Sequence, residues 1–160
     1  MTNGQVTIAA RLPMLAAFLL LAACAALQQP GPGAGASNAA APALAKIRSE
    51  NGLLPLIPDS RLEQAALRQA TYMARAGDLT HTTGWRRDFA SRMRKADIHG
   101  FREENIAYGR FDTAKVLNVW MNSSPHRKNM LNPKVTRFGL ASVDDGKGDG
   151  RYYWAMVLDD

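Results

Sequence analysis

Apolar residues recur three and four positions apart along the middle of the chain, which predicts amphipathic helices. The first predicted helix covers residues 44–50. The second runs from Ser60 to Ala76, with Ser60 and Glu63 forming a capping box and Gly77 ending it.

Three further helices are predicted between residues 85 and 131, each with apolar residues on one face. The first of these has Trp85, Phe89, Met93 and Ala96 on its inner face. The second is capped by Asp112 or Thr113, and its inward residues are Val116, Leu117, Trp120 and Met121. The third is a short helix with Ser124 as its N-cap and Pro125 as its first residue.

The C-terminal part of the chain has the composition of strands. Residues 135–143 and 152–158 are rich in β-branched and aromatic residues, and a glycine-rich loop separates them, which predicts an antiparallel hairpin. Helices followed by strands indicate an α+β fold with helices packed on an antiparallel sheet. The loop does not fit an EF-hand calcium site, because Lys147 and Met156 stand at the third and twelfth positions counted from Asp145.

The N-terminal part lacks these patterns. Arg11 precedes an uncharged run over residues 12–27, which is shorter than the roughly 20 residues of a membrane span and resembles the core of a signal peptide. Residues 25–43 are almost entirely Ala, Gly, Pro, Ser, Gln and Asn, which predicts a flexible tether. We therefore expect a signal peptide over residues 1–23, a tether over 24–41 and one domain over 42–160.

Composition narrows the class of protein. The chain has 160 residues, of which 46% are hydrophobic and 21% charged, which suits one globular domain. A single cysteine excludes an intramolecular disulfide and a cysteine-rich zinc site. The formal charge of +6 favours contact with anionic surfaces.

Candidate chemistry rests on two histidines and a glutamate. His81 follows a predicted helix, His126 lies in the short helix, and Glu104 lies between them, but their spacing alone does not unite them. Ser123 stands three residues before His126, so a serine–histidine hydrolase oriented by Glu104 is a further hypothesis. The chain has no Gly-x-Ser-x-Gly motif and no glycine-rich phosphate loop.

Several stretches, in this order and spacing, resemble the CAP superfamily, which includes cysteine-rich secretory proteins, antigen 5, pathogenesis-related proteins and many bacterial members. The matching stretches are Met73-Ala74-Arg75-Ala76-Gly77-Asp78-Leu79-Thr80-His81, Glu104-Asn105-Ile106-Ala107-Tyr108-Gly109, residues 120–133 around Ser124-Pro125-His126, Phe138-Gly139-Leu140 and Tyr152-Tyr153-Trp154. The resemblance spans residues 41–158 and implies an α-β-α sandwich.

The resemblance also implies a ligand-binding cleft formed by His81, Glu104, Asn105, Ser123 and His126. In the family, two histidines and two glutamates can hold a divalent cation such as zinc. Here the position of the second glutamate is Ser123, so His81 and His126 are the remaining candidate zinc ligands. A glycine that usually precedes the motif glutamate is replaced by Glu103, which could face solvent or lie beside Glu104. We expect His99, which lies outside every motif, to be a surface residue.

The export segment ends in Leu21-Ala22-Ala23-Cys24, which resembles the lipobox of bacterial lipoproteins. The resemblance implies that Cys24 is acylated and anchors the protein to a membrane of the cell envelope, the outer membrane being one option. Ordinary secretion after cleavage at the alanines and an uncleaved anchor are the alternatives. A catalytic role for Cys24 is disfavoured, because no packed element is predicted around it.

These observations lead to three functional hypotheses. We expect a monomeric binding module of the envelope that holds a small-molecule, lipid, glycan or peptide ligand in the cleft. The alternative is a metal-assisted hydrolase of an envelope polymer or peptide, with His81 and His126 as ligands and Glu104 as general base. Nucleic-acid binding through the basic residues 86–95 is disfavoured by the export signal, so this face is expected to be solvated or to touch anionic lipid head groups.

Overall fold

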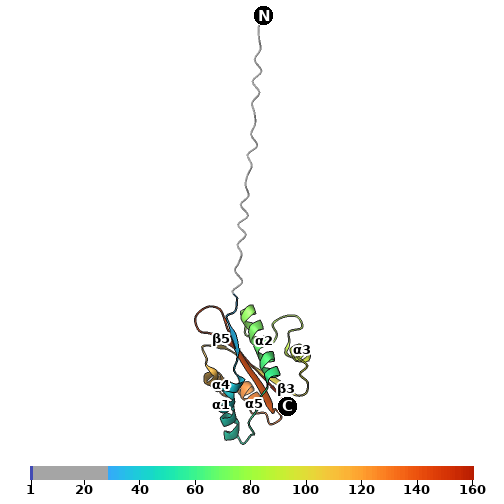
Figure 1. Ribbon diagram of the computed structural model, residues 1–160, viewed down its shortest axis with the longest axis vertical. Helices are drawn as coiled ribbons and strands as arrows, with labels where there is room; N and C mark the ends of the chain where they lie inside the picture. The colour runs from blue at the N-terminus through green and yellow to red at the C-terminus, as the bar shows by residue number, and fades with distance from the viewer. Residues whose placement is uncertain (2–28) are drawn as a thin grey trace.

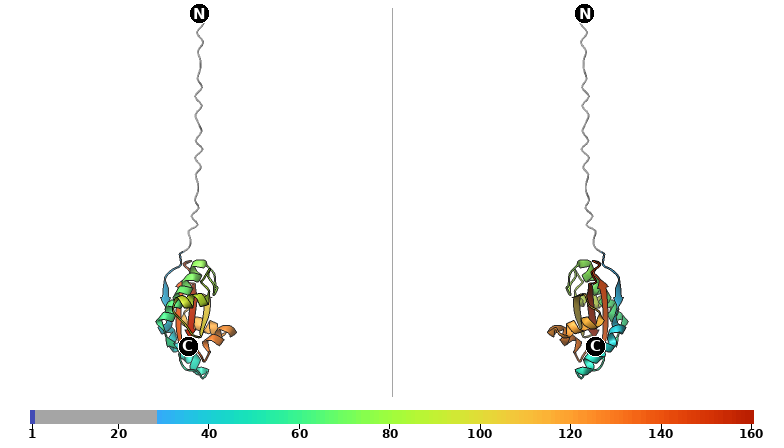
Figure 2. Two further views of the ribbon diagram at one scale, coloured as in Figure 1. Left: turned by 90° about the vertical axis from the view of Figure 1, so that its right-hand side faces the viewer. Right: turned by 90° about the vertical axis from the view of Figure 1, so that its left-hand side faces the viewer.

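A computed structural model describes residue 1 and residues 29–160 of the chain. In this part of the chain one sheet has helices on both of its faces (Figures 1 and 2). The elements are β1 (Gly33–Gly35), α1 (Ser37–Glu50), β2 (Ile57–Pro58), α2 (Ser60–Ala76), α3 (Phe89–Lys95), β3 (Arg102–Gly109), α4 (Thr113–Met121), α5 (Ser124–Met130), β4 (Arg137–Asp144) and β5 (Tyr152–Asp159).

The sheet is built around the predicted hairpin. β4 and β5 pair antiparallel with Phe138 opposite Leu158, which confirms that prediction. β3 pairs antiparallel with β5, and β1 pairs antiparallel with β4, so the strand order is β1-β4-β5-β3. The two-residue β2 lies parallel to one end of β4. β3 is therefore at an edge of the sheet, where its side chains can reach residues of either helical layer.

Alternate residues along the strands face opposite helical layers. Ile106, Ala155 and Val157 pack with α2 and α3. Ala107, Met156 and the other residues of opposite parity pack with α1, α4 and α5. The α-β-α sandwich implied by the family resemblance is thus confirmed.

α2 lies unusually close to the sheet at one position. A Cβ atom added to Gly139 on β4 would overlap backbone atoms of Leu62 and Glu63 on α2. This close approach explains why glycine stands in the middle of the Phe138-Gly139-Leu140 motif.

The domain begins earlier than the predicted boundary at residue 42. Residues 33–35 pair with β4, and the first helix starts at Ser37 and continues through Pro42. Ser37 and Ala40 are buried. The prediction of a flexible tether is therefore wrong from residue 33 onward. Cys24, the signal peptide and the first part of the tether lie outside the described residues.

Two predicted helix starts are corrected by the capping contacts. Asp59, not Ser60, caps α2 by accepting hydrogen bonds from the backbone N–H groups of Arg61 and Leu62. The Glu63 carboxylate instead accepts a hydrogen bond from Ser37 N at 2.9 Å, so it caps α1 across the fold. At α5 the N-cap is Ser123, one residue earlier than expected.

α3 is shorter than the helix predicted from residue 85. Asp88 caps it by accepting a hydrogen bond from Ser91 N, and Arg86 adopts a left-handed backbone conformation with φ of 55° that a helix excludes. Trp85 lies outside the helix and is 88% exposed. Its predicted place on the inner face is therefore wrong, whereas Met93 is buried as expected. No helix within residues 29–160 is long and apolar enough to cross a membrane.

Candidate functional site

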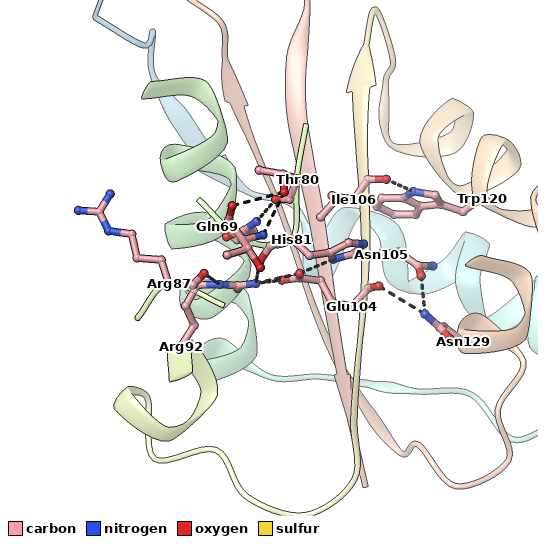
Figure 3. A network of polar contacts seen from close by, with 11 residues as sticks. Gln69, Thr80, His81, Arg87, Arg92, Glu104, Asn105, Ile106, Trp120 and Asn129 are labelled. Atoms are coloured by element: carbon pink, nitrogen blue, oxygen red, sulfur yellow. Dashed lines mark hydrogen bonds and ion pairs between the residues drawn. The ribbon is translucent and has the colours of Figure 1, made fainter. Parts of the chain in front are cut away.

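The candidate site lies along the edge strand β3, where successive side chains point to opposite faces of the sheet. Glu104 points toward α2 and α3, and Asn105 points toward α4 and α5 (Figure 3). Both are buried, at 7% and 0% exposure. The predicted site is therefore two polar clusters that meet at one edge of the sheet.

The first cluster is centred on the Glu104 carboxylate, whose side chain is only 2% exposed. Arg92 Nη2 donates to Oε1 at 2.8 Å and lies 2.8 Å from Oε2 as well. His81 Nδ1 lies 2.8 Å from Oε1. Because the carboxylate accepts, His81 carries its proton on Nδ1, and this bond orients the imidazole. The His81 side chain is 52% exposed, so it presents its outer edge to solvent.

Arg92 is the main site residue that the sequence does not reveal. Helical spacing predicts it on the basic outer face of a helix, yet it is 5% exposed. Its Nε donates to Arg87 O at 3.1 Å, and Nη2 lies 3.3 Å from His81 O. The available signal is its position: Arg92 is three residues after Phe89 and one before Met93, which places it beside the inner face. A carboxylate buried on β3 needs such a cation.

A buried glutamine of α2 fixes the loop that carries His81. Gln69 is 0% exposed, and its Nε2 donates to Thr80 O at 2.7 Å. This hydrogen bond ties the residue before His81 to a helix that is itself packed on the sheet (Figure 3). Gln69 is not among the predicted site residues, because a polar residue on an amphipathic helix is normally expected at the surface.

The second cluster joins β3 to the start of α5. Asn105 Nδ2 donates to His126 O at 3.0 Å, and Asn129 Nδ2 donates to Asn105 Oδ1 at 2.9 Å. Trp120 Nε1 donates to Ile106 O at 3.0 Å and anchors α4 to the same strand. Asn105 therefore holds the backbone of His126 in place rather than its ring.

The surroundings of the His126 ring favour its neutral form. Burial, and then the charge of His81, hold the pKa of His126 below its usual range, so the ring is neutral at neutral pH. Its Nδ1 is buried without a hydrogen-bond partner among the described residues. A neutral imidazole can accept a hydrogen bond or ligate a metal.

Ser123 and Glu103 take no part in the carboxylate cluster. Ser123 caps α5 through its backbone, and in the described part of the chain no hydrogen bond joins it to His126. This leaves the serine–histidine hydrolase without geometric support. Glu103 faces away from Glu104 and accepts a hydrogen bond from Asn132 Nδ2 at 3.0 Å. Burial raises the pKa of Glu103.

The donor set does not fit a catalytic zinc centre. Residues 29–160 contain no group of three or more His, Cys, Asp or Glu side chains that could hold a metal ion. Glu104 is engaged by Arg92, which leaves His81 and His126 as the candidate ligands. A catalytic zinc ion usually has three protein ligands.

Comparisons with known proteins identify the family. The sequence pattern of the CAP family, described as the cysteine-rich secretory protein family, matches residues 43–158. The chain belongs to this family. It is 33% identical over 100 residues to the uncharacterized protein YkwD of Bacillus subtilis. That match covers 62% of this chain and 39% of YkwD, so the chain spans about two fifths of the relative's length.

Two solved structures have the same fold. One is an extracellular protein of Bacillus anthracis that contains an SCP domain, with a TM-score of 0.66 and 24% identity, covering 78% of this chain and 40% of that one. The other is an outer surface protein of Borrelia burgdorferi, with a TM-score of 0.68 and 22% identity, covering 80% of this chain and 96% of that one. At these identities the likeness confirms the fold and leaves the ligand open.

Proposed function

We propose that this protein is an extracytoplasmic binding module that recognises a lipid, glycan or peptide of the cell envelope through the site formed by His81, Glu104 and His126. The observation that carries the proposal is that the Glu104 carboxylate is buried and paired with a cation. Its side chain is 2% exposed and is engaged by the Arg92 guanidinium. A general base must reach the proton that it removes, and this carboxylate is enclosed.

Glu104 instead positions the neighbouring His81 to contact a ligand. It fixes the ring orientation of His81, which is half-exposed, while the buried Asn105 fixes the backbone of His126. Side chains that are held in place before a ligand arrives lose little conformational entropy on binding. The His81 imidazole is thus a preorganised hydrogen-bonding group at the surface, and the His126 imidazole is carried on a backbone that is fixed in place. Metal-assisted hydrolysis is the alternative function, and the engagement of Glu104 by Arg92 counts against it.

The three histidines provide a direct test of this proposal. In NMR spectra of chain labelled with 13C in the imidazole rings, a ligand at the site is expected to shift the His81 and His126 resonances. His99 is the internal control, because it is exposed and paired with Asp97 away from the site. Suitable probes are palmitate, a chito-oligosaccharide and a tripeptide, each added separately. Equal shifts at all three histidines, or none with any probe, would contradict the proposal.

The same samples separate binding from hydrolysis. A binding module returns each probe intact, as detected by mass spectrometry, with or without added zinc. Cleavage that disappears in Glu104→Gln would establish the hydrolase instead. Zinc that shifts His81 and His126 and leaves His99 unchanged would show that the two histidines ligate metal without hydrolysis.

The envelope location is proposed from the N-terminal sequence and from the relatives described as an extracellular and an outer surface protein. We propose that Cys24 carries the lipid anchor. Cys24→Ser is then expected to move most of the protein from the membrane fraction to the soluble fraction, because acylation provides the stable attachment. Immunoblots of fractionated cells measure this distribution. Ala26→Ser is the matched control and is expected to stay with the membrane; an unchanged distribution of Cys24→Ser would refute the anchor.

A further inference from the structure

A hollow of about 300 Å³ lies between α2 and α3, beside the Glu104 cluster, with which it shares Arg92. Of the described residues that line it, none is Asp or Glu. Its lining includes six cationic side chains: Arg61, Arg68, Arg86, Arg87, Arg92 and Lys95. We refer to it as the basic hollow.

Five of these cations lack a carboxylate partner among the described residues. Arg92 is neutralised by Glu104, whereas Arg61 donates only to the backbone carbonyl of Asp97, at 2.7 Å. No ion pair within residues 29–160 involves Arg61 or the other four, which are Arg68, Arg86, Arg87 and Lys95. Like charges gathered around one hollow repel one another, and an anion entering the hollow relieves that repulsion. Guanidinium groups match the geometry of phosphate oxygens.

The cations are held in position by the structure. The Arg87 guanidinium lies 4.7 Å from the centre of the Tyr72 ring, and Arg87 N donates to Gly84 O at 3.0 Å. Arg86 has a left-handed backbone, which is costly for a residue with a side chain, and its carbonyl accepts a hydrogen bond from Lys95 Nζ at 3.4 Å. The turn thus brings two arginines to the hollow at a local conformational cost.

An exposed tryptophan lies next to these arginines. Trp85 is 88% exposed, and the Arg86 guanidinium lies 5.4 Å from its ring. Exposing a large aromatic ring to water costs free energy, so Trp85 is unexpected on a face that is merely solvated. Tryptophan together with unpaired cations is typical of protein surfaces that contact the membrane interface. We infer that the basic hollow binds the phosphate headgroup of an anionic membrane lipid, with Trp85 entering the interface beside it.

Vesicle binding tests this inference. The full chain carrying Cys24→Ser, which has no cysteine to acylate, is expected to bind phosphatidylglycerol vesicles at least tenfold more tightly than phosphatidylcholine vesicles, with an affinity that falls as salt rises. Brominated phosphatidylglycerol is expected to quench Trp85, since Trp120 and Trp154 are buried. Trp85→Phe is expected to lose this quenching; quenching that persists in Trp85→Phe, or equal affinity for both lipids, would overturn the inference.

A matched pair of variants separates the hollow from net charge. Arg68→Gln combined with Lys95→Gln removes one hollow cation from each helix and is expected to weaken phosphatidylglycerol binding about tenfold or more. Arg75→Gln combined with Arg94→Gln removes the same charge from the same helices outside the hollow and is expected to weaken it less than threefold. Equal weakening by both pairs would show that only net charge matters and would overturn the inference.

A final experiment distinguishes a soluble phosphate ligand from a membrane lipid. Inorganic pyrophosphate, titrated into the same chain in a calorimeter, reports phosphate binding without a membrane. Binding of pyrophosphate with no binding to either vesicle would overturn the membrane-lipid assignment in favour of a soluble phosphate ligand. The inference does not depend on the proposed function, because none of these measurements involves a ligand at His81 or His126.

Discussion

Replacing Arg92 with methionine is expected to lower the free energy of unfolding by about 3–5 kcal/mol. Arg92 is 5% exposed and is the cation that neutralises Glu104, whose side chain is 2% exposed. Methionine fills much of the same volume but leaves the carboxylate buried, with the ring of His81 as its one remaining side-chain partner within residues 29–160. Urea denaturation followed by circular dichroism measures the change.

Two controls isolate the ion pair from packing. Arg94→Met makes the same substitution two residues away on the same helix, at an exposed position, and is expected to change stability by less than about 0.5 kcal/mol. Combining Arg92→Met with Glu104→Gln removes both charges and is expected to restore a large part of the loss. If Arg92→Met alone cost less than about 1 kcal/mol, the carboxylate would have to be solvated or protonated in the folded protein.

The pair also shows where sequence reasoning reaches its limit. Helical spacing correctly predicts α2, α4 and the burial of Trp120, and strand composition correctly predicts the β4–β5 hairpin. Such patterns assume that charged residues face water. Arg92 and Glu104 violate that assumption together, since each is buried only because the other is present. No local pattern reveals a partner that the fold brings from another element.

The hydrophobic pattern does not predict β3 as a strand, for a related reason. Its first three residues after Arg102 are Glu103, Glu104 and Asn105, a polar run that does not resemble a strand with one apolar face. At the sheet edge these residues are satisfied by Asn132, Arg92 and Asn129 instead of by water. Glu104 is predicted as a site residue only through the family motif, because hydrophobic periodicity carries no information about polar residues that are paired inside the fold.

The start of α1 is hidden by composition. An Ala-rich segment has high helix propensity, but the neighbouring Gly and Pro residues make the region resemble a tether. The helix is stabilised by tertiary contacts: Ala40 and Leu44 are fully buried, and Glu63 accepts a hydrogen bond from Ser37 N. These contacts come from residues that lie far along the chain, so the helix boundary is a property of the fold.

Gly139→Ala is expected to lower the free energy of unfolding by about 3 kcal/mol or more. The new methyl group would overlap the backbone of Leu62 and Glu63, and backbone atoms of a packed helix cannot move aside as a flexible side chain would. α2 would have to shift away from β4. Since Glu63 caps α1, such a shift would also disturb the Ser37–Glu63 hydrogen bond. Urea denaturation measures the loss, and the amide resonance of Ser37 reports the movement of the cap.

Gly148→Ala is the matched control for this prediction. Gly148 has a φ of 72° and nothing lies within 4 Å of an added Cβ, so alanine there meets only the backbone cost of a left-handed conformation, about 1–2 kcal/mol. Gly139 has the opposite situation: a crowded position without a left-handed backbone. If Gly139→Ala cost no more than Gly148→Ala, α2 would be free to separate from the sheet. The arrangement that fixes Gln69 and, through it, the loop carrying His81 would then be far less rigid than the packing indicates.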